Sequence, residues 1–357
     1  MIKELVLENF RGVREGRLKL FPMTVLLGAN NSGKTTVLEA LYLLYPPSPI
    51  CLSTYYGAPP STGLKTLAVA EVIHAYHRTL DSRGYRFLIH NYDGEAVIAC
   101  YLDEEFKALI FRARNGYLEV EEATGAYSDL SAFMHGVKVR STKVVHACNL
   151  SDSGGVSKMD SRTTKCLFMK PHISDMAMAY VREKWGLIRG RGLTGKVAAE
   201  LSKLVNEDYD DLTLEPHIGG GLSLNAILKE SKIGIRLGDM GDGMRMLVLA
   251  MLLKELINAK LILWDDVEAF MSPSSLIYLS QWLAGLVEQG AQVVVATHSR
   301  EAAKLLAGAV EEAGQKARIM LLALREGVLK HKVLTLDEVE TLELAGVDVR
   351  MAEDFLL

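Results

Sequence analysis

One eight-residue segment has the residue types and spacing of a phosphate-binding loop. Residues 28–35 read Gly-Ala-Asn-Asn-Ser-Gly-Lys-Thr, which fits the pattern GxxxxGK[ST] at every position. Glycine lets backbone N–H groups approach phosphate oxygens, the lysine reaches the β- and γ-phosphates, and the next hydroxyl is a ligand for Mg²⁺. We therefore expect Lys34 to bind phosphate and Thr35 to bind Mg²⁺. The neighbouring residues are expected to contact the nucleotide: Asn30, Asn31, Ser32, Gly33 and Thr36.

A pair of acidic residues follows a short, continuously apolar segment. The run Leu-Ile-Leu-Trp at 261–264 is typical of a central parallel strand that is buried on both faces. Ligands of open α/β sheets bind at the carboxyl ends of such strands. Asp265 is therefore placed to hold Mg²⁺, and Asp266 to position or polarise the attacking water. For Glu268 two interpretations stay open: it shares the general-base role, or it is a first-turn glutamate at a helix N-terminus.

Two further segments have residues that could contact phosphate. Residues 237–245 contain three glycines and two aspartates and precede an apolar helical stretch, so their free N–H groups could bind an anion. A loop that only caps the helix is the alternative. The residues concerned are Gly241, Asp242 and Gly243. His298 follows another apolar run, where a histidine can hydrogen-bond a γ-phosphate or orient water, or have a purely structural role.

The elements that must position these residues alternate between strand and helix. Apolar runs bounded by turn residues predict strands at 3–8, 23–27, 261–264 and 292–296. Periodic apolar residues predict helices at about 34–45, 244–259 and 273–289. The alternation predicts an α/β fold whose parallel core is split into residues 1–45 and 235–330.

The first part of the intervening segment is expected to be rich in β-structure. Residues 46–150 begin with a Pro-, Ser- and Gly-rich stretch at 46–64, which predicts a surface loop. Short apolar runs from 85 to 122 are separated by turn dipeptides such as Asn115-Gly116. This spacing predicts an antiparallel meander.

The second part is expected to be a small helical lobe over residues 151–234. Helical stretches at about 173–185 and 195–206 follow a Ser-, Gly- and Lys-rich segment. The lobe has a basic bias with acidic residues interspersed, which indicates a solvated surface or a face for nucleic acid or a partner. Its basic residues are Arg182, Lys184, Arg189, Arg191, Lys196 and Lys203. Residues 331–357 are expected to form a C-terminal tail.

Composition excludes several classes of protein. The chain has 357 residues, a net charge of −4 and four scattered cysteines without a CxxC pair. It has no apolar run long enough to span a membrane and no apolar N-terminal leader, which together predict a cytoplasmic protein that is not membrane-bound. The charge gives no overall footprint of a nucleic-acid-binding protein.

The order of the four chemical segments resembles the ATP-binding-cassette (ABC) class of P-loop ATPases. In that class the segments are the Walker A, signature, Walker B and H-loop motifs. Within the class, Leu7-Glu8-Asn9-Phe10-Arg11 resembles the opening "NFR" segment of the SMC/RecF/OLD-like branch. Two further segments resemble stand-alone AAA-labelled ATP-binding proteins related to OLD-family ATPases. These are the Gly-Asp-Gly turn with its following Arg245, and the Gly-x-Asp-x-Arg tail at 346–350.

The resemblance implies a P-loop fold of the ABC type with an antiparallel β lobe and an inserted helical lobe. It also implies ATP and Mg²⁺ as cofactors, Arg11 at the nucleotide, and a homodimer that sandwiches two nucleotides. In such a dimer Gly243 would face the γ-phosphate bound by the partner. The leading hypothesis is an ATP-gated dimeric switch coupled to a protein effector, such as a nuclease in defence against foreign DNA. The alternatives are a RecF-like repair ATPase that binds DNA, and a nucleotide-gated scaffold with little hydrolysis.

Three departures from the family pattern bear on mechanism. The signature serine is Gly241 here, and the usual catalytic glutamate is Asp266, which is one methylene shorter. The first glutamine in the sequence is Gln281, so the usual Q-loop glutamine is absent. We therefore expect hydrolysis to be slow, and another group to contact Mg²⁺ and water at the Q-loop position.

Overall fold

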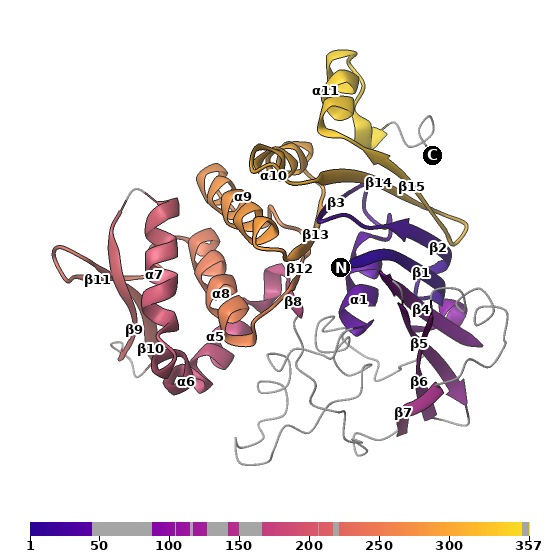
Figure 1. Ribbon diagram of the computed structural model, residues 1–357, viewed down its shortest axis with the longest axis horizontal. Helices are drawn as coiled ribbons and strands as arrows, with labels where there is room; N and C mark the ends of the chain where they lie inside the picture. Colours follow the sequence, from indigo (N-terminus) through magenta and orange to yellow (C-terminus); the bar gives the residue numbers. More distant parts are fainter. Residues whose placement is uncertain are drawn as a thin grey trace.

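A mixed β-sheet forms the centre of the computed structural model (Figure 1). The structure describes residues 1–44, 88–103, 105–114, 117–126, 142–149, 166–205, 207–216, 221–351 and 357. Within these residues the sheet has twelve strands in the order β7-β6-β5-β4-β1-β2-β15-β14-β3-β13-β12-β8. The strands on the amino-terminal side are β1 (Ile2–Phe10), β2 (Val13–Lys19), β4 (Glu95–Leu102), β5 (Glu105–Arg114), β6 (Tyr117–Ala126) and β7 (Thr142–Asn149). The others are β3 (Met23–Leu27), β8 (Cys166–Met169), β12 (Leu261–Trp264), β13 (Gln292–Thr297), β14 (Ala317–Arg325) and β15 (Val328–Leu334).

Five neighbouring strands, β14, β3, β13, β12 and β8, run parallel and form the core that carries the site. Their side chains alternate between two hydrophobic cores. Leu26 and Val294 pack on the face covered by α1 (Lys34–Leu44), whereas Val25 and Val293 pack on the other face. That second face is covered by α8 (Asp242–Ile257), α9 (Pro273–Glu288) and α10 (Arg300–Glu312). The carboxyl ends of buried parallel strands therefore meet at one edge, between the two helical layers.

The predicted α/β fold is confirmed, and the strands expected near the motifs are present. The predicted helices are also found, with ends that differ by one or two residues. The expected meander is confirmed as the antiparallel ladder β4-β5-β6. Its turn at Asn115-Gly116 lies outside the described residues, as do the loop expected at 46–64 and the segment 151–165.

The expected helical lobe contains β-strands as well as the predicted helices. It contains α5 (Ser174–Glu183), α6 (Trp185–Gly190) and α7 (Leu193–Leu204), as well as a three-stranded sheet. The strands of that sheet are β9 (Tyr209–Pro216), β10 (Leu222–Leu228) and β11 (Gly234–Arg236). The region also supplies β8 to the large sheet, so the expected lobe of residues 151–234 is not separate from the core.

The C-terminal region also contributes to the core. β15 lies between β14 and β2, so part of the expected tail completes the sheet before α11 (Leu336–Leu344) begins. Among the described residues, no helix has the length and apolar character needed to cross a membrane.

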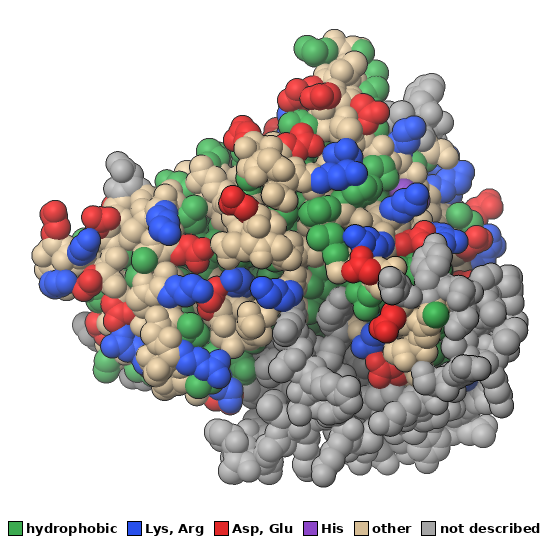
Figure 2. Space-filling model, viewed as in Figure 1, with side chains coloured by type: hydrophobic (Ala, Val, Ile, Leu, Met, Phe, Trp, Pro, Cys, Tyr) green, Lys and Arg blue, Asp and Glu red, His purple; other side chains and the backbone are tan. Residues whose placement is uncertain are grey.

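Figure 2 shows basic side chains on the helical lobe mixed with acidic ones. Several basic residues of this lobe are paired with a carboxylate: Lys184 with Glu183, Arg189 with Asp211, and Lys196 with Glu255. Such pairing reduces the net field of the surface, which favours the solvated-surface interpretation over a nucleic-acid face.

Candidate functional site

The phosphate loop joins β3 to α1 and requires glycine at two places. A Cβ atom on Gly28 would lie 2.6 Å from the carbonyl oxygen of Leu322, so a side chain there would push the loop away from β14. Gly33 has a φ of +93°, a conformation that side-chain-bearing residues rarely adopt, and Asn31 is left-handed at +61°. The loop thereby forms a tight turn that leads directly into the first residues of α1, Lys34, Thr35 and Thr36.

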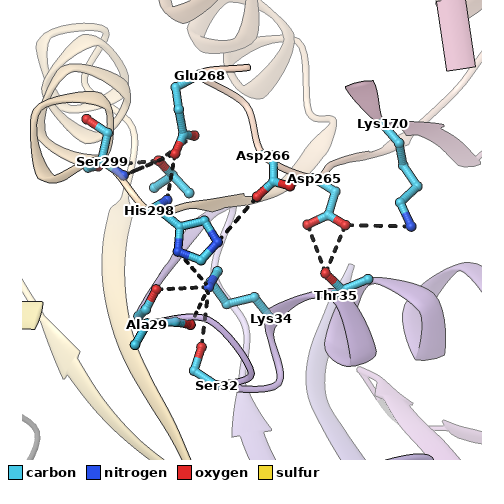
Figure 3. Close-up of polar contacts among 12 residues, drawn as sticks. Ala29, Ser32, Lys34, Thr35, Lys170, Asp265, Asp266, Glu268, His298 and Ser299 are labelled. Atoms are coloured by element: carbon cyan, nitrogen blue, oxygen red, sulfur yellow. Dashed lines mark hydrogen bonds and ion pairs between the residues drawn. The ribbon is translucent and has the colours of Figure 1, made fainter. Parts of the chain in front are cut away.

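The ammonium group of Lys34 lies inside this loop (Figure 3). Its Nζ donates to the carbonyl oxygens of Gly28 and Ala29, each 2.9 Å away. Ser32 Oγ and His298 Nδ1 each lie 3.4 Å from the same nitrogen. The Lys34 side chain is almost fully buried, so its positive charge is concentrated where the sequence predicts phosphate.

Thr35 and Asp265 face each other across the loop. The Thr35 hydroxyl donates to Asp265 at 2.9 Å from Oδ2 and 3.2 Å from Oδ1. Mg²⁺ is commonly bound by one or two such oxygen ligands together with phosphate oxygens. Among the described residues, no group of three or more His, Cys, Asp or Glu side chains could hold a metal alone. The residues present therefore fit Mg²⁺ bound together with a nucleotide.

A lysine that the sequence analysis missed lies beside this pair. Lys170 follows β8, whose last residue Met169 pairs with Trp264, so Lys170 and Asp265 come next on adjacent parallel strands. Lys170 Nζ is 3.7 Å from Asp265 Oδ2. Burial raises the pKa of Asp265, and the nearby charge of Lys170 opposes that rise. No local pattern in the sequence predicts that β8 lies next to β12, so Lys170 could not be identified from the sequence.

Glu39 and Arg11 extend the charged group behind the loop. Glu39 lies one turn after Thr35 on α1, is fully buried, and forms ion pairs with Arg11 and with Lys170. Burial lowers the pKa of Arg11 to about 10. Arg11 was expected at the nucleotide, and the structure places it in this cluster next to the first turn of α1.

Asp266 and His298 lie next to each other above Lys34, whereas Thr35, Asp265 and Lys170 lie to one side of it (Figure 3). His298 Nε2 is 3.5 Å from Asp266 Oδ1, and its Nδ1 faces Lys34. The imidazole therefore bridges the phosphate-loop lysine and the second carboxylate of the acidic pair. Asp266 is 47% exposed, which leaves its carboxylate accessible to water.

Glu268 has a role that neither sequence interpretation described. Its Oε1 accepts from the backbone N–H groups of His298 and Ser299, at 2.7 Å and 3.2 Å. Its Oε2 accepts from the Thr297 hydroxyl at 2.7 Å. Glu268 thus holds the turn between β13 and α10 instead of beginning a helix of its own. The carboxylate fixes the backbone that carries His298.

The Gly-x-Asp-x-Arg tail reaches the same peptide from the other side. Arg350 Nη1 donates to the His298 carbonyl oxygen at 3.2 Å. Arg350 is itself held by Asp348, with Nη2 2.7 Å from Oδ2 and Nε 3.1 Å from Oδ1. The His298 peptide is therefore bound at its N–H by Glu268 and at its C=O by Arg350.

The Gly-Asp-Gly turn begins α8, on the face of the sheet opposite to α1. Gly241 has a φ of +89°, and a Cβ atom on Gly243 would lie 2.9 Å from Ser275 Oγ at the start of α9. Among the described residues, no hydrogen bond or ion pair joins Gly241, Asp242 or Gly243 to residues 28–35. The structure therefore does not bring the turn to the phosphate loop through any contact of the described residues.

Comparisons with known proteins agree with this geometry. Residues 1–112 match the AAA ATPase domain family. No curated protein matches the sequence. The fold is similar to the Smc head domain of Pyrococcus furiosus with an extended coiled coil, bound to the C-terminal domain of ScpA, at 13% identity. The match covers 96% of this chain and 98% of that chain, with a TM-score of 0.51.

A second SmcHead structure, bound to the C-winged helix domain of ScpA, is 15% identical to this chain. The match covers 95% of this chain and 99% of that chain, with a TM-score of 0.50. At these identities the likeness concerns the fold. The family match supports an ATPase domain over residues 1–112, and the likeness to the two solved structures supports its fold.

Proposed function

We propose that this chain is an ATP-gated dimeric switch that binds Mg-ATP at the phosphate loop and hydrolyses it slowly. The observation that carries the proposal is the convergence of Lys34, Thr35, Asp265, Asp266 and His298 at one sheet edge. These residues come from three separate segments and present a lysine, a hydroxyl–carboxylate pair, and a carboxylate–imidazole pair.

Each group has a role in this proposal that follows from its position. Lys34 and the loop N–H groups bind the β- and γ-phosphates, and Thr35 and Asp265 hold Mg²⁺. Bound Mg²⁺ would neutralise charge on the phosphate oxygens. Asp266 accepts a proton from the attacking water, and His298 donates a hydrogen bond to the γ-phosphate.

Dimerisation would complete the site from the second subunit. The N-terminus of α8 offers N–H groups at Gly241, Asp242 and Gly243, and lies on the sheet face opposite to α1. A second copy related by two-fold symmetry would place its own turn against this loop and the reverse. The dimer would then be stable only while the γ-phosphate bridges the two copies.

The output of the switch is proposed to be a protein effector. The two Smc head structures of similar fold are bound to parts of ScpA, which supports a protein partner for a domain of this shape. A nuclease acting against foreign DNA remains our hypothesis for that effector. The mixed charges of the helical lobe give less support to the alternative of a RecF-like ATPase that binds DNA directly.

A nucleotide-gated scaffold with little hydrolysis is the second candidate, and one observation favours it. Glu268, the first glutamate after the acidic pair in the sequence, is hydrogen-bonded to the Thr297 hydroxyl and to backbone N–H groups, so the shorter Asp266 is left to activate water. Such a scaffold would bind ATP and dimerise as proposed but turn over very slowly.

The test is to measure ATP affinity, hydrolysis rate and molecular mass with Mg-ATP, with and without double-stranded DNA. The wild type is compared with Lys34→Ala and Asp266→Asn. We expect Lys34→Ala to lose binding and Asp266→Asn to accumulate a dimer. ATP binding by Lys34→Ala equal to wild type would overturn the proposal, and strong stimulation by DNA would favour the repair alternative.

A further inference from the structure

The strongest unexplained feature of the site is the buried lysine beside the metal ligands. The Lys170 side chain is only 13% exposed, and its ammonium lies 3.5 Å from Glu39 Oε1 and 3.7 Å from Asp265 Oδ2. It also lies 5.4 Å from the ring centroid of Phe168, where the π-face attracts a cation. Burying an ammonium is costly unless carboxylates accompany it, so these contacts account for its position.

The contact with Glu39 would hold the Lys170 ammonium in place whether or not Thr35 and Asp265 bind a metal. The fully buried carboxylate of Glu39 is on α1, one turn after Thr35, and it forms ion pairs with both Lys170 and Arg11. When Asp265 binds a metal, Lys170 can keep both Glu39 and the Phe168 ring. The ammonium is therefore a fixed charge of the site and not only the temporary counter-ion of Asp265.

The register of the sheet places this charge next to Asp265, in a chain that has no glutamine before Gln281 to contact the metal. The Asp265 N–H donates to Met169 O at 2.9 Å, so the last backbone contact of β8 with β12 lies directly before Lys170. A neutral amide can contact metal-bound water but adds no charge. An ammonium adds a full positive charge next to Thr35 and Asp265.

We propose that Lys170 is a nucleotide-site residue whose fixed positive charge lets this chain bind a nucleoside triphosphate with reduced dependence on Mg²⁺. The inference rests on the proposed function, because it assumes that the triphosphate binds at Lys34. Lys170 supplies part of the charge neutralisation that the metal supplies elsewhere, while Thr35 and Asp265 remain the metal ligands.

The test compares ATP affinity in excess EDTA with ATP affinity in Mg²⁺, by calorimetry or a fluorescent ATP analogue. Lys170→Gln should lower the metal-free affinity roughly 10-fold, the size expected of one charge at short range in a partly hydrated site. Its affinity for Mg-ATP should fall less than about 3-fold, since the metal then supplies the charge. Lys170→Arg should retain metal-free binding.

Two controls separate the possible failures. Lys316→Gln removes another lysine that lies over an aromatic ring, 5.2 Å from that of Phe21, and should change neither affinity. If Lys170→Gln does not fold because Glu39 loses one of its two cationic partners, Lys170→Met, which keeps an unbranched apolar stem beside Phe168, is measured in the same way and should show the same metal-free loss. Wild type that binds no ATP in Mg²⁺ would overturn the proposed function. Wild type that binds, with equal metal-free affinity in Lys170→Gln, would overturn this inference alone.

Discussion

The contacts of Glu268 predict that removing its side chain lowers the stability of the fold, and lowers the rate of ATP hydrolysis only indirectly. Glu268→Ala deletes a carboxylate that accepts three hydrogen bonds, from the Thr297 hydroxyl and from the N–H groups of His298 and Ser299. Hydrogen bonds to a charged group contribute about 1.5–3 kcal/mol each, but three that share one side chain do not add fully. Because water can reach part of this turn, we expect a loss of about 3 kcal/mol.

Thermal unfolding and steady-state ATP hydrolysis are the assays. For a chain of this length, with roughly 2 cal/mol/K of unfolding entropy per residue, about 3 kcal/mol corresponds to a decrease of about 4 °C in Tm. Glu268→Gln keeps a carbonyl oxygen that can accept, so it should lose about half as much. Hydrolysis should fall about 10-fold in the alanine variant, because His298 is less well positioned, and less in the glutamine variant.

Asp266→Asn is the matched comparison, because the Asp266 carboxylate is half-exposed and is the proposed proton acceptor for the attacking water. It should leave Tm within about 1 °C of wild type while hydrolysis falls by about 100-fold or more. The reasoning on Glu268 would be refuted if Glu268→Gln behaved in the same way as Asp266→Asn. That result would make Glu268 the general base.

The tail and the phosphate loop give three further predictions. Gly28→Ala should abolish measurable ATP binding and destabilise the fold by about 1–3 kcal/mol, because its Cβ would meet the Leu322 carbonyl. Calorimetry measures the loss of binding, and thermal unfolding measures the loss of stability. Arg350→Ala should lower kcat about 10-fold with KM for ATP unchanged, and should have no further effect in a His298→Ala background; additive losses would contradict the positioning role. The hydrogen bond from Arg350 lowers the pKa of Asp348 to about 2, so the stabilisation is present at neutral pH and is lost as the pH falls from about 4 towards 2. Asp348→Asn should therefore lower Tm more at pH 7 than at pH 3.5, and an equal decrease at both pH values would count against the ion pair.

Local patterns were sufficient to predict the parts of the site that lie within one strand–turn–helix unit. The strands that precede the phosphate loop, Asp265 and His298 are short, largely apolar runs followed by diagnostic residues, so apolar pattern and turn chemistry identify them. The antiparallel ladder was predictable for the same reason.

Residues whose position depends on strand order could not be predicted. β8 has four residues, and only its pairing with β12 brings Lys170 to Asp265. Arg350 contacts His298 from the C-terminal tail, which follows the last strand of the sheet in the sequence. The contacts of Glu268 could not be predicted because its partners lie at the turn after β13, about thirty residues further along the chain. Long-range contacts of this kind leave no periodic signal in the sequence.

The central claim is that each active site is shared between two copies of the chain. It is tested most directly by mixing two variants that are inactive alone. Lys34→Ala cannot bind phosphate, and Gly241→Glu places a carboxylate at the turn where the partner's γ-phosphate is expected, in space that is open within the chain. The backbone there, at φ +89° and ψ 157°, lies in a region that is essentially restricted to glycine and costs another residue about 1–3 kcal/mol, so folding of Gly241→Glu is first verified by circular dichroism.

In an equimolar mixture, each mixed pair would have one intact site, formed by the phosphate loop of Gly241→Glu and the turn of Lys34→Ala. Because neither variant can bridge a dimer with itself, the shared-site account predicts that hydrolysis returns to at most about half of the wild-type rate, since a two-fold dimer has two equivalent sites. Hydrolysis by Gly241→Glu alone at the wild-type rate would contradict it. So would a mixture that stays inactive although Gly241→Glu binds ATP and Lys34→Ala is folded.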